Sequence, residues 1–251
     1  MHKQILIIAF LLAFKAISAQ GDVSDTATNM PMIQINYGLQ LPGNDLANRY
    51  GMNHTAGATF MYKTHKNWLF GVKFNYLFSE NVKNKEDILS GIATEDGNII
   101  DGNGMLTEVN YHERGFYSNV SIGKLFPVIG PNQNSGIFLI GGVGLLQHKT
   151  LIQNPENKAP QISGEYTKGY DRLTNGLAVS EFIGYMHIGN GTMSSFYVGA
   201  ELIQAWTQSR RDYNFNKMKN VTDQRFDTLW GLRIGWILPI SGKTSGEYHY
   251  F

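Results

Sequence analysis

Residues 228–239 read Thr-Leu-Trp-Gly-Leu-Arg-Ile-Gly-Trp-Ile-Leu-Pro, and this stretch decides the fold. Successive side chains of a β-strand point to opposite faces, so the even and odd positions form two separate sets. The odd set includes Gly231, Gly235 and the charged Arg233, whereas the even set is bulky throughout: Trp230, Leu232, Ile234, Trp236 and Leu238. A soluble sheet would turn its bulky face onto a core. We expect the reverse, with the bulky face on lipid and Arg233 inside a closed barrel.

Seven further runs with this alternation precede the stretch. In the third run, six large apolar side chains share one face, while Lys73 and Asn75 share the other. A soluble protein rarely exposes so continuous an apolar face, so we expect that face to lie in lipid. Most runs have at least the about 9–11 residues that a tilted strand needs to cross a bilayer. The eight runs are residues 32–41, 55–64, 68–79, 114–126, 136–150, 175–188, 195–207 and 228–239.

The connections between the runs alternate in length. Residues 42–54, 80–113, 151–174 and 208–225 are long and polar, whereas the breaks between the other runs are short. This alternation is typical of a barrel with short periplasmic turns and long external loops. We therefore predict an all-β fold, an eight-stranded antiparallel up-and-down transmembrane β-barrel with four long external loops. Both termini are then expected in the periplasm.

The first residues have the pattern of a secretory signal peptide. His2 and Lys3 precede an apolar run of ten residues, and Ile17-Ser18-Ala19 supplies the small residue at the expected cleavage site. We predict a signal peptide over 1–19 and a single outer-membrane barrel domain over 20–251. Cleavage would remove two of the 21 basic residues and leave 19 against 20 acidic ones. This balance argues against a nucleic-acid partner.

The inward set of side chains is expected to be small and polar, because an eight-stranded barrel has room only for side chains. Four charged residues belong to this set by our register: Lys73, Glu181, Glu201 and Arg233. Charges of both signs in a dry lumen should pair, so we predict a lumenal network with Glu201–Arg233 as its core pair. The sixth run then turns Phe182 and Met186 away from Glu181, and the fifth groups Phe138, Ile140 and Leu146 on one bulky face.

The chain resembles the small outer-membrane β-barrel proteins of Gram-negative bacteria. Ser-Ala-Gln at 18–20, Gly-Tyr-Asp-Arg-Leu-Thr-Asn-Gly at 169–176 and Gly-Leu-Arg-Ile-Gly-Trp-Ile-Leu-Pro at 231–239 are similar to barrels of the Bacteroidota type. The resemblance covers essentially the whole chain after residue 19. It implies location in the cell outer membrane, among lipid and lipopolysaccharide. Some members of that group are accessory subunits of secretion or barrel-assembly machines, which implies protein partners in the envelope.

The sequence offers little that indicates catalysis. Lipid A-modifying barrels use a serine and a histidine near the outer rim, and His54, His112 and His148 lie near rims by our register. A Gly-x-Ser-x-Gly elbow is absent from the sequence. The Asp/Asn/Gly turns at 96–98 and 101–104 lack the order of a calcium loop. We expect a non-enzyme without cofactor or metal, and the alternatives are a lipid A-modifying acyl hydrolase or a narrow small-solute porin.

Two of the long loops differ strongly in charge. Residues 80–113 hold eight acidic and two basic side chains, whereas 208–225 hold five basic and two acidic ones. Opposite charge could tie these loops together or present each to a partner. Arg210 and Arg211 beside Tyr213 and Phe215 form an Arg/aromatic mixture that is enriched at interfaces. We therefore predict a structural and interaction subunit of an envelope complex, which binds other outer-membrane or surface proteins through these loop residues.

Overall fold

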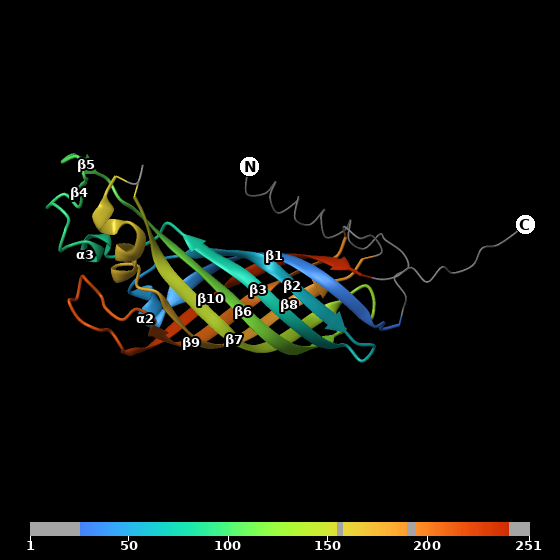
Figure 1. The fold of residues 1–251 in the computed structure, drawn as a ribbon. Helices are drawn as coiled ribbons and strands as arrows, with labels where there is room; N and C mark the ends of the chain where they lie inside the picture. Colours follow the sequence, from blue (N-terminus) through green and yellow to red (C-terminus); the bar gives the residue numbers. More distant parts are fainter. Residues whose placement is uncertain (1–25, 155–157, 190–193, 241–251) are drawn as a thin grey trace, which may run out of the picture.

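Eight long strands form a closed antiparallel barrel in the part of the chain that the computed structural model describes, residues 26–154, 158–189 and 194–240 (Figure 1). The strands follow one another around the ring in the order β1-β10-β9-β8-β7-β6-β3-β2. This confirms the predicted eight-stranded up-and-down barrel. The strands are β1 (Met30–Gly43), β2 (Asn53–Lys63), β3 (Trp68–Ser79), β6 (Asn110–Phe126), β7 (Gly136–Gln153), β8 (Thr174–His187), β9 (Phe196–Ser209) and β10 (Gln224–Pro239).

The first and last strands close the ring. Their register runs from Met32 opposite Pro239 to Gly43 opposite Thr228, so the stretch 228–239 pairs along its whole length with β1. On its other side the same stretch pairs with β9, through contacts such as Gly231 opposite Glu201. Closure leaves the ring of eight described strands without an unpaired edge, so their backbone hydrogen bonds are satisfied as a lipid environment requires.

The two ends of the barrel differ as the connection lengths predicted. Residues 64–67, 127–135 and 188–195 connect strands at the end where β1 begins and β10 finishes. Four loops connect them at the opposite end, which Figure 1 shows on the left, and the last three of these are longer than the connections at the first end. We call them loop 1 (44–52), loop 2 (80–109), loop 3 (154–173) and loop 4 (210–223). The predicted signal peptide, 1–19, lies outside the described residues.

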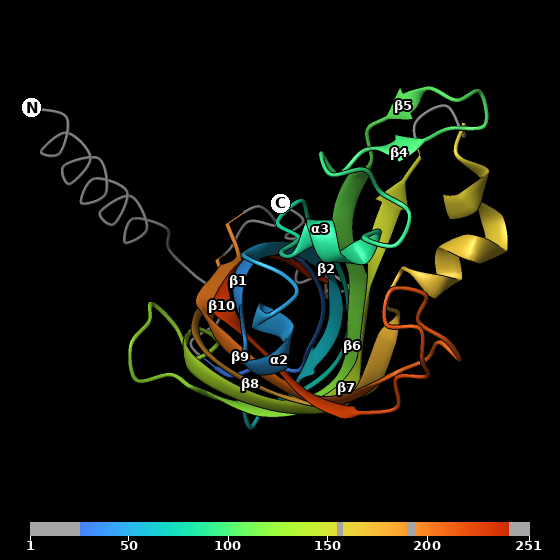
Figure 2. The same cartoon turned by 90° about the vertical axis from the view of Figure 1, so that its left-hand side faces the viewer.

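The loops contain short elements of their own. Loop 2 holds α3 (Lys85–Ile88), β4 (Ile99–Ile100) and β5 (Leu106–Thr107), and loop 3 holds two 3-10 turns, η2 (Pro160–Ile162) and η3 (Gly164–Gly169). Loop 1 contains α2 (Asn44–Ala47), which Figure 2 shows inside the ring of strands when the barrel is viewed from its loop end. Across the described ranges, the helices lack the length and apolar character needed to cross a membrane.

Loop 1 differs from its prediction as an external loop, because its helix turns into the barrel. Asn44 adopts a positive φ of 51°, a left-handed conformation that asparagine tolerates better than most residues, and the chain bends inward there. Leu46 and Tyr50 are then fully buried in the upper lumen. Loop 1 is therefore a plug that closes the loop end of the barrel.

The alternation of side chains is as predicted in most strands but not in β7 and β8. In β1, β2, β3, β6, β9 and β10 the predicted bulky face points outward, and the face with most of the glycines and polar residues points inward, together with large residues such as Tyr117 and Ile237. In β7 and β8 the register is the opposite of our expectation, since Phe138, Leu146, Phe182 and Met186 are buried in the lumen. Glu181 consequently faces outward.

Glycines in neighbouring strands explain why the lumen accepts these large side chains. Phe138, Phe182 and Tyr197 form an aromatic cluster with ring centroids 5.1–5.9 Å apart. A Cβ on Gly199 would come within 2.5 Å of the Phe182 ring, and a Cβ on Gly235 within 2.2 Å of the Tyr197 ring. The aromatic rings therefore occupy the space that side chains at these two positions would fill.

Candidate functional site

A belt of apolar side chains covers the outside of the barrel. These residues come from all eight strands and are well exposed: examples are Ile35, Phe60, Val72, Phe74, Val120, Ile122, Val143, Leu177, Ile183, Val198, Leu232 and Ile234. Soluble monomers rarely expose contiguous apolar patches beyond a few hundred Å². Together with the closed ring, the belt indicates a surface that faces membrane lipid.

Three of the four charged residues predicted to be lumenal meet in the middle of the barrel. Glu201 on β9 is the shared acceptor: Lys73 Nζ donates to its Oε1 at 2.5 Å, and the Arg233 guanidinium donates to its Oε2. Lys73 comes from β3, which lies across the ring from β9, whereas Arg233 is on the adjacent β10. All three side chains are at least nine-tenths buried. The predicted Glu201–Arg233 pair is therefore present in the structure.

A fourth polar group completes the coordination of Glu201. Gln40 Nε2 on β1 donates to Glu201 Oε2 at 3.3 Å. Gln40 and Glu201 lie opposite Gly231 on the two strands that flank β10. Because Gly231 has no side chain, they can contact each other across β10. A Cβ on Gly231 would come within 1.9 Å of the Leu39 carbonyl oxygen. The carboxylate thus has three donors, as a buried charge requires.

Glu181 does not belong to this network, which corrects its predicted place. It lies on β8 one residue before the inward-facing Phe182, and its own side chain is exposed on the outer surface. The prediction failed because it assigned Glu181 to the lumenal face of this strand and Phe182 and Met186 to the lipid face. In the structure, packing of Phe182 in the aromatic cluster fixes the register of β8 and turns Glu181 outward.

The four loops pack together into one cap over the plugged end. One apolar cluster joins the loop end of the lumen with buried residues of loops 1, 2 and 3, among them Leu46, Ile88 and Ile162. Phe215 of loop 4 packs against this cluster. The Phe215 ring meets Tyr170 edge-on at 5.3 Å, and its backbone amide donates to the Gly169 carbonyl at 3.1 Å. The loops therefore share one hydrophobic core with the neighbouring part of the lumen.

The predicted partner-binding residues of loop 4 divide into two groups. Arg211 and Phe215 attach the loop to loop 3, Arg211 through a two-pronged ion pair with Asp171. Arg210 and Tyr213 remain exposed, although Arg210 Nε also donates to Asn175 Oδ1 at 2.5 Å. Only part of the predicted set is thus available to a partner on the surface of the cap.

Neutral hydrogen bonds join loop 2 to its neighbours. Ser90 Oγ donates to Asn216 Oδ1 of loop 4 at 2.6 Å, and Gln161 Nε2 of loop 3 donates to the Ile100 carbonyl at 2.6 Å. The ion pair that holds loop 4 is made with Asp171 of loop 3 and not with an acidic residue of loop 2. The charge difference between loops 2 and 4 is therefore left on the surface of the cap.

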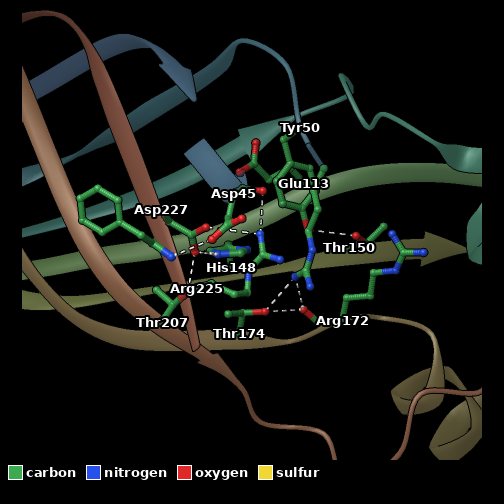
Figure 3. A network of polar contacts seen from close by, with 12 residues as sticks. Asp45, Tyr50, Glu113, His148, Thr150, Arg172, Thr174, Thr207, Arg225 and Asp227 are labelled. Carbon is green, nitrogen blue, oxygen red and sulfur yellow. Dashed lines mark hydrogen bonds and ion pairs between the residues drawn. The ribbon is translucent and has the colours of Figure 1, made fainter. Parts of the chain in front are cut away.

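A buried polar network lies beneath the cap, at the top of the lumen (Figure 3). Asp227 is fully buried and accepts from three groups: Thr207 Oγ1 at 2.5 Å, His148 Nε2 at 3.0 Å and the Arg225 guanidinium at 3.4 Å. Arg225 also donates to the Asp45 carbonyl of α2 at 2.7 Å. The network thereby attaches the plug to the barrel wall.

Loop 1 extends this network on the other side of the lumen. Arg49 Nη1 donates to Thr174 Oγ1 at 3.0 Å, and the Tyr50 hydroxyl lies 3.0 Å from Thr150 Oγ1. Burial, together with the positive charge of Arg225, lowers the pKa of Arg49 to about 10. Burial also raises the pKa of the Tyr50 phenol. Both groups thus keep their usual protonation states at neutral pH and act as structural contacts.

The histidines near the rims are engaged in structural contacts. His148 is fully buried against Asp227, His54 Nδ1 lies 2.6 Å from the Tyr37 hydroxyl, and His112 Nε2 lies 3.1 Å from Gln153 Oε1. Within the described residues, none of the three is hydrogen-bonded to a serine or threonine hydroxyl that could serve as a nucleophile. The same part of the chain contains no group of three or more His, Asp or Glu side chains placed to hold a metal ion.

The lumen beside the charge cluster is nearly filled. A cavity of about 30 Å³ lies beside the charge cluster and is lined by Lys73, Asn119, Ser180 and Arg233, among others. Such a space accommodates roughly one water molecule. The aromatic cluster closes the barrel below this level, and the loop 1 plug closes it above.

Comparison with known proteins finds similarity only among solved structures. No protein-family model matches the chain, and no curated protein matches it. Ail, the attachment invasion locus protein of Yersinia pestis, was solved with and without the heparin analogue sucrose octasulfate. The structure of the complex is 11% identical, covers 84% of this chain and 99% of that chain, and has a TM-score of 0.45. The outer membrane protein OprG from Pseudomonas aeruginosa is 12% identical over 85% and 97%, with a TM-score of 0.36. Likeness of this degree assigns no activity to the chain.

Sequence reasoning missed the buried network beneath the cap. His148 and Asp227 are 79 residues apart. His148 belongs to the even face of the run 136–150, which we expected to point outward, and Asp227 precedes the run 228–239. Continuing the alternation of β10 by two residues upstream of Leu229 would have placed Asp227 inside the barrel. Alternation places Gln40 on the inward face of β1, but its contact with Glu201 depends on the missing side chain of Gly231.

Proposed function

We propose that the protein is a non-catalytic outer-membrane β-barrel that serves as a structural and interaction subunit of an envelope complex. The apolar belt supports a membrane location, and the long loops are placed outside the cell with both termini in the periplasm. The proposal assigns the complex to secretion or outer-membrane biogenesis. Its surroundings are outer-membrane lipid and lipopolysaccharide, and its partners are other envelope proteins.

The observation that carries the proposal is the folded cap with apolar residues exposed at its outer edge. The cap is held by a shared apolar core and by hydrogen bonds between loops, so it is ordered before any partner binds. The β4–β5 hairpin nevertheless exposes about two-thirds of the Met105 and Leu106 side chains, and Tyr166 and Met218 are similarly exposed. A rigid surface with exposed apolar side chains and arginine is typical of a protein–protein interface.

Quantitative affinity purification in mild detergent tests this role. We expect the wild-type protein to retain a stoichiometric envelope protein, and the double variant Met105→Ser/Leu106→Ser to retain at least tenfold less. Val128→Ser/Ile129→Ser is the matched control, because these residues form an equally exposed apolar pair at the opposite end of the barrel. Absence of a stoichiometric companion for the wild-type protein would overturn the proposal.

Three further measurements address the orientation, the absence of catalysis and the closed lumen that we propose. A tag inserted after Gly104 should be detected on intact cells, and a tag at the C-terminus only after permeabilisation. Lipid A from a deletion strain should have the same mass spectrum as lipid A from its parent, and a changed spectrum would contradict the non-catalytic proposal. Planar bilayers containing the protein should give flat current traces, since the lumen is blocked.

A further inference from the structure

An acidic side chain stands in the middle of the lipid-facing belt. Glu181 lies near the centre of β8 and faces outward. Its register partners are Gly141 on β7 and Leu202 on β9, neither of which can neutralise a carboxylate. Ile183, the next outward residue on β8, is 55% exposed and apolar. Among the described residues, no hydrogen-bond donor or cation contacts Glu181.

Glu181 also lies in a shallow groove of the outer surface. The groove has a volume of about 700 Å³ and crosses strands β7 to β10. Its floor contains Gly141 and Ala200, and a Cβ built on Gly141 would meet open space. Leu139, Trp230 and Leu232 stand around this floor. We call this depression with its central carboxylate the Glu181 groove.

Fluid lipid does not account for both features. An ionisable side chain facing hydrocarbon is unfavourable, and inside membranes such residues are found paired or at functional sites. Lipid chains can fill a groove, but they carry no group that could donate to a carboxylate. Cationic headgroups remain at the bilayer surface, far from the centre of β8. The occupant that fits is a segment that is apolar overall and carries one basic side chain.

We propose that the Glu181 groove docks a membrane-embedded segment of a different envelope protein, which places an arginine or lysine against Glu181. Charge decides against a second copy of this chain, because the outward residues of the groove include no cation and like faces would bring two carboxylates together. Small residues on the floor allow close approach, as they do at other contacts within membranes. This inference rests on the proposed function and adds to it a second interface, separate from the cap.

Site-specific photo-crosslinking in living cells tests the groove. A photoreactive phenylalanine derivative replaces Ile183 beside Glu181, and in a control strain it replaces Phe60, which is similarly exposed on β2, across the ring from β8. We expect one protein adduct at Ile183 and none at Phe60. The crosslinked partner peptide should come from a membrane-embedded segment and contain an arginine or lysine.

Variants at Glu181 and Gly141 then test the two parts of the site. Glu181→Leu and Gly141→Leu should each reduce the adduct at least tenfold, whereas Ala58→Leu, a comparable enlargement at an outward position of β2, should leave it unchanged. Glu181→Lys should abolish the adduct, and exchanging the partner's basic residue for glutamate should restore it. Folding is checked in lipid vesicles, where Glu181→Leu should be at least as resistant to urea as the wild type, because it removes a charge from the belt.

Several results would overturn the inference. They are an adduct with the mass of two copies of this chain, an adduct only with lipid, or an adduct whose yield is the same in Glu181→Leu. The outcome is separable from that of the proposed function. A companion that still co-purifies with Glu181→Leu at full yield would leave the cap interface standing while removing the groove. Failure of the wild-type protein to retain any companion would remove the proposed function itself.

Discussion

The lumenal cluster makes an asymmetric prediction, because one anion serves two cations. Glu201→Gln keeps the shape of the side chain but removes the only charge that neutralises Lys73 and Arg233 within the cluster. Lys73→Met removes one cation and leaves a balanced Arg233–Glu201 pair. We therefore expect Glu201→Gln to destabilise the barrel considerably more than Lys73→Met does.

The magnitude follows from the geometry. At the 2.5 Å that separates Lys73 Nζ from Glu201 Oε1, the attraction is about 7 kcal/mol for an effective dielectric constant of 20. In the wild type, the cost of removing the charges from water offsets most of this attraction. Once the anion is gone, the desolvation cost of the two cations is no longer compensated. Loss of one partner from a buried ion pair typically costs about 3–5 kcal/mol. For Lys73→Met, whose loss leaves the remaining pair neutral, we expect roughly 1 kcal/mol.

Equilibrium unfolding in urea, with the protein folded into lipid vesicles, measures both free energies. Trp206 and Trp230 are exposed on the outer surface, so their fluorescence should report loss of lipid contact on unfolding. The double variant Lys73→Met/Glu201→Gln serves as the coupling control. It should be more stable than Glu201→Gln alone, because it removes one of the two unpaired cations.

The outcome that would refute this reasoning is specific. Glu201→Gln within about 1 kcal/mol of the wild type would show that water or rearrangement compensates the two cations. A larger loss for Lys73→Met than for Glu201→Gln would show that the contact of the Lys73 ammonium with the Tyr117 ring, and not its ion pair with Glu201, dominates the cluster. Either result would contradict the assignment of Glu201 as the shared acceptor.

Three further predictions concern the loop end of the barrel. Asp227→Asn should lower the free energy of unfolding by about 3 kcal/mol, because His148 and Arg225 lose a buried charged acceptor. Thermal unfolding, followed by the change in gel mobility, measures this loss. Gly169→Ala should displace the Phe215 ring, because the alanine Cβ would come within 2.1 Å of it. Hydrogen exchange should therefore rise in loop 4 without a comparable change in the barrel strands. The amides of Met105 and Asn103 donate to Asp101 and lower the pKa of its carboxyl. Its contribution to loop stability is thus complete above the unfolded pKa of about 4 and lost as pH falls through the lower folded value. Exchange at the Met105 amide should increase in that range, and Asp101→Asn should remove the pH dependence.

Period-two alternation and connection length were sufficient to predict the architecture of the barrel. Both are local properties, because the pleat of a strand separates odd from even side chains wherever the strand lies. The stretch 228–239 shows this clearly: its bulky even positions face outward and Arg233 faces inward, as its sequence indicated. Strand number followed from counting such runs, and the order around the ring followed from the short turns between them.

Which side-chain face of β7 and of β8 points into the lumen depends on the whole barrel. Both faces of these strands carry large side chains, so their alternation alone could not decide which face belongs to the lumen. Glycines on β9 and β10 make room for aromatic rings from β7, β8 and β9, and that space exists only once the ring has closed. Glu181 was therefore placed on the wrong side until the packing of Phe182 was known.

The meeting of distant side chains also depended on closure. The sequence indicated that Glu201 and Arg233 should pair, because adjacent strands bring them together at a diagonal position. It also placed Lys73 in the same lumenal network, but it did not indicate that Lys73 would reach this carboxylate from the opposite wall of the lumen, or that loop 1 would turn inward to form a plug. Alternation along a strand is set by local backbone geometry. The occupants of the lumen are set by the diameter and register of the closed ring, which no single segment contains.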